Sequence, residues 1–119
     1  MKSKSIVQER LDAGKNRLEI LTREVEANRM AKEELSKGLR QVGVYLESVQ
    51  RMVRTDTNVK FAQPIDSKLE VGMNRLEGVI KALEGNGITV NDLNANLSQV
   101  HRMFDSVQEF VDLEIEDLA

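Results

Sequence analysis

Hydrophobic residues recur at alternating steps of four and three positions along the first half of the chain. The repeat runs from Val7 to Val53 without a slip, and eleven of its fourteen positions are apolar. A seam of this spacing held over about six heptads is typical of a helix in a coiled coil or a bundle. No proline interrupts it. The pattern therefore predicts one long helix over residues 5–54.

The hydrophobic stripe of this long helix changes width near its middle. From Ala31 onward a second row of mostly apolar residues lies beside the seam, which suits packing against two neighbouring helices. Before that point the same row is charged, and the narrow stripe suits a single partner helix. Asn28 and Lys32 interrupt the seam where the width changes. They either pair across an oligomer and fix its register, or mark a fork between an intermolecular coiled coil and a bundle.

Two shorter helices follow a connector at residues 55–64. A seam from Ile65 to Leu83 predicts a second helix over 65–84, with Asp66 or Ser67 as its N-cap. The tripeptide Gly85-Asn86-Gly87 is a strong signal for a helix end and a turn. A third helix is expected over 88–117, capped by Thr89 or Asn91.

These lengths predict a single all-α domain over residues 1–119 whose three-helix bundle covers only the second half of the long helix. The first half would project as a coiled-coil segment with its apolar seam bare, so a second copy of the chain is expected to cover it. An Asp at Leu18 or Leu21 should then break self-association and leave the bundle helical. The predicted oligomer interface consists of Val7, Leu11, Leu18, Leu21, Val25 and Asn28.

The amino-acid composition restricts the fold classes and the cellular locations that are expected. Aromatic residues make up 3% of the chain and there is one proline, which argues against an all-β fold. The absence of cysteine excludes disulfides and thiolate metal sites. No apolar stretch is long enough for a membrane span and no signal peptide is visible, so a cytoplasmic protein is expected, or a virion-associated one if it comes from a phage.

No catalytic constellation stands out along the sequence. His101 is the only histidine, which leaves no convincing zinc set, and it is expected to be an ordinary residue beside the third seam. The Gly85-Asn86-Gly87 turn lacks the strand before it and the Lys-Ser/Thr after it that a phosphate-binding loop needs. We therefore expect neither enzymatic activity, nor a cofactor, nor a bound metal.

Charge is unevenly divided along the chain. Residues 1–60 hold 13 Lys or Arg and 9 Asp or Glu, whereas residues 61–119 hold 4 and 11. The basic residues of the first helix alternate with glutamates, as on the solvated surface of a coiled coil, although an oligomer would array them toward a polyanion. The candidate polyanion contacts are Arg10, Lys15, Arg17, Arg23 and Arg29.

Two segments are candidates for contact with another protein. The C-terminal segment alternates apolar and acidic residues, which suits either docking on a partner or an acidic last helical turn. Phe61 in the connector either caps the end of the bundle or is an exposed anchor. The candidate partner-binding residues are Phe61, Val111, Leu113, Ile115 and Leu118.

These features favour a non-enzymatic helical assembly or adaptor protein that self-associates and binds another protein, with no membrane contact. Small oligomeric helical proteins are common in phage and bacterial assembly systems, which makes such a role an analogy. The alternative is a nucleic-acid-associated accessory protein, of the packaging or recombination type, that uses the basic residues of the first helix.

Overall fold

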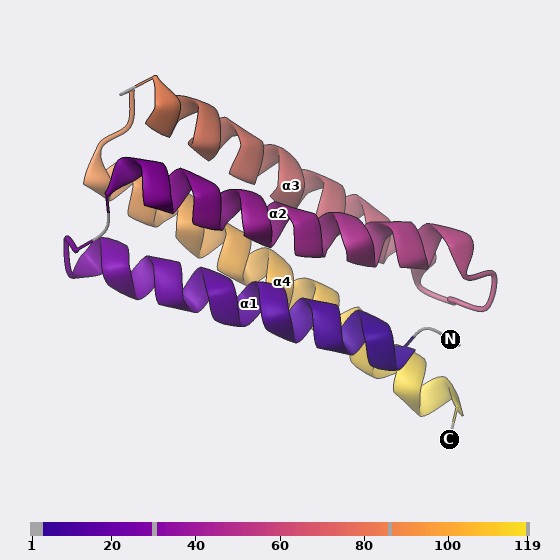
Figure 1. The fold of residues 1–119 in the computed structure, drawn as a ribbon. Helices are drawn as coiled ribbons and strands as arrows, with labels where there is room; N and C mark the ends of the chain where they lie inside the picture. The colour runs from indigo at the N-terminus through magenta and orange to yellow at the C-terminus, as the bar shows by residue number, and fades with distance from the viewer. Residues whose placement is uncertain (1–3, 30, 86, 119) are drawn as a thin grey trace.

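The computed structural model describes residues 4–29, 31–85 and 87–118, with side chains described as far as Glu114. The described residues form four α-helices: α1 (Lys4–Glu26), α2 (Lys32–Thr55), α3 (Ala62–Glu84) and α4 (Val90–Leu118). The helices lie side by side and alternate in direction, so that consecutive helices are antiparallel (Figure 1). The α1–α2 and α3–α4 turns lie at one end of the molecule, and the two termini and the α2–α3 loop lie at the other.

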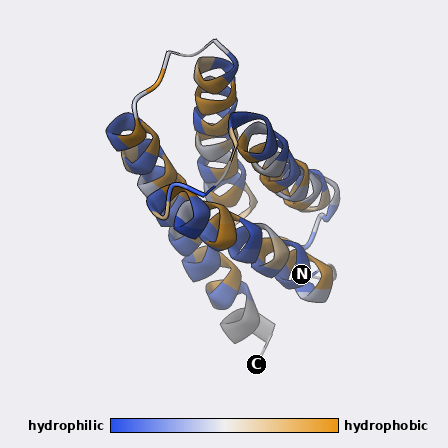
Figure 2. Ribbon diagram, turned by 60° about the vertical axis from the view of Figure 1, so that its left-hand side comes forward, coloured by the Kyte–Doolittle hydropathy of each residue, from blue (hydrophilic) through white to orange (hydrophobic). Residues whose placement is uncertain are grey.

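Each helix packs against two neighbours around a shared apolar core. Helix α1 contacts α2 and α4, while α3 contacts α2 and α4 on the opposite side. Every helix has a hydrophobic side and a hydrophilic side (Figure 2). The core is built from the heptad seams of all four helices, and Leu18, Leu39, Leu69 and Leu97 are each fully buried in it. The chain is therefore an all-α four-helix bundle in which one seam per helix points inward.

The prediction of a single helix over residues 5–54 is wrong, because the chain turns back between Glu26 and Lys32. A straight helix would leave the seam from Val7 to Val25 in water, whereas the turn folds that seam onto α2 and α4 of the same chain. The turn falls at Asn28 and Lys32, the two polar residues that interrupt the seam. The expected three-helix bundle with a projecting half is replaced by four helices, and α1 completes the bundle.

Helix α1 ends in a Schellman motif centred on Asn28. The Arg29 N–H donates to the Glu24 carbonyl and the Asn28 N–H donates to the Val25 carbonyl, each at 3.0 Å. Asn28 has φ 54°, in the left-handed region where Asn is the best substitute for glycine. Ala31, the N-cap of α2, is extended, with φ −67° and ψ 148°. A turn whose sequence contains neither Gly nor Pro therefore makes the reversal.

The predicted ends of the other helices are mostly close to the observed ones. The Thr89 hydroxyl accepts the Asp92 N–H at 3.1 Å, so Thr89 caps α4 as one of the two residues expected there. Helix α3 begins at Ala62, before the predicted start, and the Asp66 side chain instead accepts from Arg54. Pro64 is tolerated because it lies in the first turn of α3, where a backbone N–H has no partner within the helix.

None of the helices in the described part of the chain is both long and apolar enough to cross a membrane.

Candidate functional site

The five apolar residues of the predicted oligomer interface lie inside the bundle. Leu18 and Leu21 have no exposed surface, and Val25 retains 9%. Val7 and Leu11 are also buried in the core, whereas Asn28 is exposed in the α1–α2 turn. The folded chain thus covers this seam itself and does not leave it as a free surface.

Four of the candidate polyanion residues are spread around α1 and not gathered on one face, and Arg29 lies in the α1–α2 turn. Lys15 pairs with Asp105 of α4 at 3.3 Å, and Arg29 pairs with Glu24 at 3.3 Å. Arg10 lies 3.5 Å from the Ser48 hydroxyl of α2. Arg17 is half-buried with a buried Nε atom that has no hydrogen-bond partner, and only Arg23 is an exposed cation with no contact of this kind.

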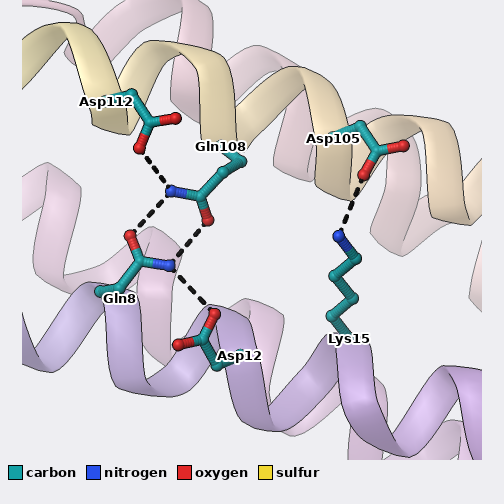
Figure 3. Close-up of polar contacts among 6 residues, drawn as sticks. All are labelled: Gln8, Asp12, Lys15, Asp105, Gln108 and Asp112. Carbon is teal, nitrogen blue, oxygen red and sulfur yellow. Dashed lines mark hydrogen bonds and ion pairs between the residues drawn. The ribbon is translucent and has the colours of Figure 1, made fainter.

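A chain of polar contacts joins α1 to α4 (Figure 3). The side-chain amides of Gln8 and Gln108 donate to each other's oxygens at 2.7 Å. Each amide also donates to the carboxylate one turn further along its own helix, Gln8 to Asp12 at 3.0 Å and Gln108 to Asp112 at 2.8 Å. Because these groups satisfy one another, the cluster fixes how α1 lies on α4 and offers little to a ligand.

The interface between α1 and α4 also contains His101, which is half-buried against α1. Its Nε2 lies 3.1 Å from the Thr22 hydroxyl, which itself donates to the Leu18 carbonyl at 2.8 Å. Burial lowers the pKa of His101, partly opposed by the nearby carboxylates of Glu19 and Asp105. His101 is therefore a structural hydrogen-bonding residue between two helices.

The residues proposed for partner binding meet only in part. Phe61 packs on Phe110 of α4, with ring centroids 5.7 Å apart, and both rings rest on the core. Val111 is fully buried, while Leu113 is 41% exposed. The side chains of Ile115 and Leu118 lie outside the described residues. Phe61 therefore closes the end of the bundle, and the three described members of this set, Phe61, Val111 and Leu113, do not form a continuous docking surface.

A groove between α3 and α4 brings together residues that the sequence pattern did not single out. It encloses about 330 Å³, and its cationic lining residues are Lys68, Arg75 and Arg102. These are three of the four Lys and Arg residues in the otherwise acidic stretch 61–119. No acidic side chain lines the groove.

The floor and rim of this groove are apolar or neutral. Gly72 lets Met103 approach closely, since a Cβ atom at position 72 would lie 2.7 Å from the Met103 methyl. Val71 on the rim is 63% exposed, which is unusual for a large apolar side chain. Ser67, Gln99 and Ser106 complete the lining with hydrogen-bonding groups.

The three cations remain available at the surface of the groove. The Lys68 ammonium lies 5.8 Å from the centroid of the Phe110 ring, and Arg75 donates to the Asn96 side chain at 3.0 Å. Arg75 and Arg102 are exposed. A larger hollow beside α2, which includes Lys37, Arg40 and Glu84, differs because Arg40 and Glu84 form an ion pair in it.

The signal for this groove exists in the sequence but is weak. Lys68 and Arg75 are seven residues apart and therefore lie on one side of α3. That their side faces Met103 and Arg102 follows only from the packing of α3 on α4.

The described residues offer no group of three His, Cys, Asp or Glu side chains that could hold a metal ion. Comparison of the chain with protein-family models, curated proteins and solved structures found no match. The function must accordingly be inferred from the geometry of this bundle.

Proposed function

We propose that the chain is a non-enzymatic helical adaptor that binds an acidic, partly apolar segment of another protein in the groove between α3 and α4. The observation that carries the proposal is the gathering of Lys68, Arg75 and Arg102 around an apolar floor, with no acidic side chain among the lining residues. Carboxylates of the bound segment would pair with the cations, and its apolar side chains would cover Val71 and Met103.

The form of the groove supports a helical or extended peptide as the ligand. Lys68 and Arg75 are two turns apart on α3, and carboxylates at i and i+7 of a docked helix have the same spacing. Arginine is well suited to this task because its planar guanidinium binds a carboxylate through two parallel hydrogen bonds.

Nucleic acid is the second candidate, since phosphates also pair with Lys and Arg. The basic residues of α1 and of the turn after it support this candidate less than the sequence suggested, because Lys15 and Arg29 are engaged with carboxylates of the same chain. The groove also lacks an exposed aromatic ring on which a base could stack.

A binding titration separates these candidates. The probes are a fluorescent amphipathic peptide with Asp and Glu opposite Leu, a scrambled peptide of the same composition, and single-stranded and duplex DNA. We expect the amphipathic peptide to bind more tightly than the others and to weaken as salt rises.

Paired charge reversals locate the binding site. Arg75→Glu with Arg102→Glu should weaken peptide binding by roughly tenfold or more. The matched control, Arg23→Glu with Lys37→Glu, changes the net charge equally at exposed positions away from the groove and should change affinity little. Equal losses in the two double variants, or tighter binding of DNA than of peptide, would contradict the proposal.

A further inference from the structure

The α1–α2 turn keeps the heptad register on both sides. Val25, Asn28, Lys32 and Leu35 follow one another at steps of three, four and three residues, the spacing of the seams themselves. If the turn became helical, α1 and α2 would form one straight helix with both seams on the same side. The observed turn and the continuous helix are thus alternative conformations with the same hydrophobic pattern.

The residues of this turn are unusually good helix formers. Between Glu26 and Lys32 the sequence reads Ala-Asn-Arg-Met-Ala, with no glycine or proline, and only Asn ranks low in helix propensity. The other turn at the same end of the bundle contains Gly85 and Gly87, which disfavour a helix. The reversal depends largely on Asn28, the one non-glycine residue with positive φ in the described part of the chain.

A straightened α1 leaves its place between α2 and α4, where the neighbouring side chains are matched to α1. Gly38 of α2 accepts Leu21 so closely that a Cβ atom there would lie 2.5 Å from a Leu21 methyl. On the other side, Gln108 and Asp105 of α4 pair with Gln8 and Lys15. The α1 helix of a second copy satisfies all of these contacts, running antiparallel to α2 as it does within one chain.

We propose that two copies of this chain exchange their α1 helices by straightening residues 27–31, which gives a domain-swapped dimer. Two continuous helices then lie antiparallel across a twofold axis at the former turn, and each half of the dimer contains a complete four-helix bundle. Every contact between helices is kept, so the two states differ mainly at the hinge and in the entropy of association.

The hinge end of the bundle carries apolar surface that a second copy would cover. Val90 is 57% exposed there, beside a cavity of about 170 Å³ whose lining includes Val25, Leu35 and Ile88. In the exchanged dimer the hinge ends of the two bundles face each other. This contact exists only between copies and favours the dimer.

Variants at the hinge shift the balance in opposite directions. Asn28→Ala disfavours the left-handed turn and favours the helix. It should raise the dimer association constant by roughly tenfold or more, because each dimer contains two straightened hinges. Asn28→Gly keeps the turn and disfavours the helix, and Ala31→Pro matches the observed φ of −67° but would break a continuous helix. Both should hold the chain monomeric.

The measurement is light scattering after refolding at protein concentrations from micromolar to about 1 mM. The upper limit is of the order of the effective concentration that a short linker gives to two tethered segments. We expect the dimer fraction to fall in the order Asn28→Ala, the unchanged chain, then Asn28→Gly and Ala31→Pro. A monomeric Asn28→Ala variant at every concentration, or a dimer fraction that no hinge variant changes, would overturn the proposal.

Cross-linking distinguishes exchange from simple side-by-side association. In the cysteine-free chain, Lys15→Cys and Asp105→Cys place two thiols across the α1–α4 contact. A short bismaleimide should join them within one chain in the monomer fraction and between two chains in the dimer fraction, as read on a denaturing gel. Cross-links confined to single chains in an isolated dimer would refute the exchange of α1.

Discussion

At the residue scale, the glycines of this bundle have opposite roles that depend on what a methyl group would meet. A Cβ atom at position 38 would lie 2.5 Å from a buried Leu21 methyl, whereas one at position 78 would meet nothing within 4 Å. Both glycines lie in helix interiors, where glycine is a poor helix former.

We expect Gly38→Ala to lower the free energy of unfolding by about 1–2 kcal/mol, because Leu21 must move in a packed core. Gly78→Ala should raise it by about 0.5–1 kcal/mol, since it restricts the unfolded chain and creates no clash. Urea unfolding followed by circular dichroism measures both. Stabilisation by both substitutions would show that α1 and α2 are not in close contact at Gly38.

His101 makes stability depend on pH. Its pKa in the folded chain is lowered, chiefly by burial, so the unfolded chain binds the proton more readily. Its contribution is fully present above about pH 6.5, the ordinary pKa of histidine, and decreases as the pH falls from there toward the folded pKa.

We therefore expect the unfolding midpoint in urea to decrease between about pH 7.5 and pH 5.5. The variant His101→Gln does not titrate in this range and is the control, because it retains the shared background of carboxylate titration. If both proteins show the same pH dependence, His101 does not contribute through a lowered pKa.

At the scale of elements, Glu114 holds the α2–α3 loop onto α4. Its side chain is 2% exposed and accepts the backbone N–H of Phe61. Glu114 follows Val111 by three residues, so a carboxylate occupies a core position in the seam of α4. The α2–α3 loop explains this carboxylate, since the partly buried backbone N–H of Phe61 needs an acceptor there.

Glu114→Ala should cost about 1–3 kcal/mol, the usual effect of leaving a buried donor unsatisfied. Glu109→Ala, an exposed position on the same helix, should change the unfolding free energy by less than about 0.5 kcal/mol. Hydrogen exchange of the Phe61 amide tests the cause directly: it should become faster in Glu114→Ala and stay unchanged in Glu109→Ala.

At the scale of the whole molecule, α1 is an integral part of one core. Leu18 has no exposed surface, so Leu18→Asp places a charge among the packed side chains of four helices. We expect a loss of about 4 kcal/mol or more, a large part of the stability of a typical domain. Helical circular dichroism should fall over the entire chain.

The neighbouring substitution Ile20→Asp is the control for this prediction. Ile20 is 46% exposed on the outer side of the same helix, and its replacement should leave the helical signal nearly unchanged. A Leu18→Asp chain that keeps α2 to α4 folded would mean that α1 is dispensable, as the three-helix prediction implied.

The sequence alone determined the helical class, the inward-facing residues and most helix ends, because heptad spacing, capping residues and the Gly85 turn act locally. The apolar seam residues from Val7 to Val53 and from Ile65 to Leu83 are buried as their spacing predicts. The same local signals left the partner of the first seam undetermined, since a seam is equally well covered by another chain or by its own.

The tertiary structure decided which helices cover the first seam and where the groove lies. The reversal at Asn28 became favourable because it buries the α1 seam against α2 and α4 of the same chain, a gain that no local propensity contains. The gathering of Lys68, Arg75 and Arg102 likewise depends on how α3 lies against α4. Spacing along one helix determines which side a residue occupies, and only packing determines what that side faces.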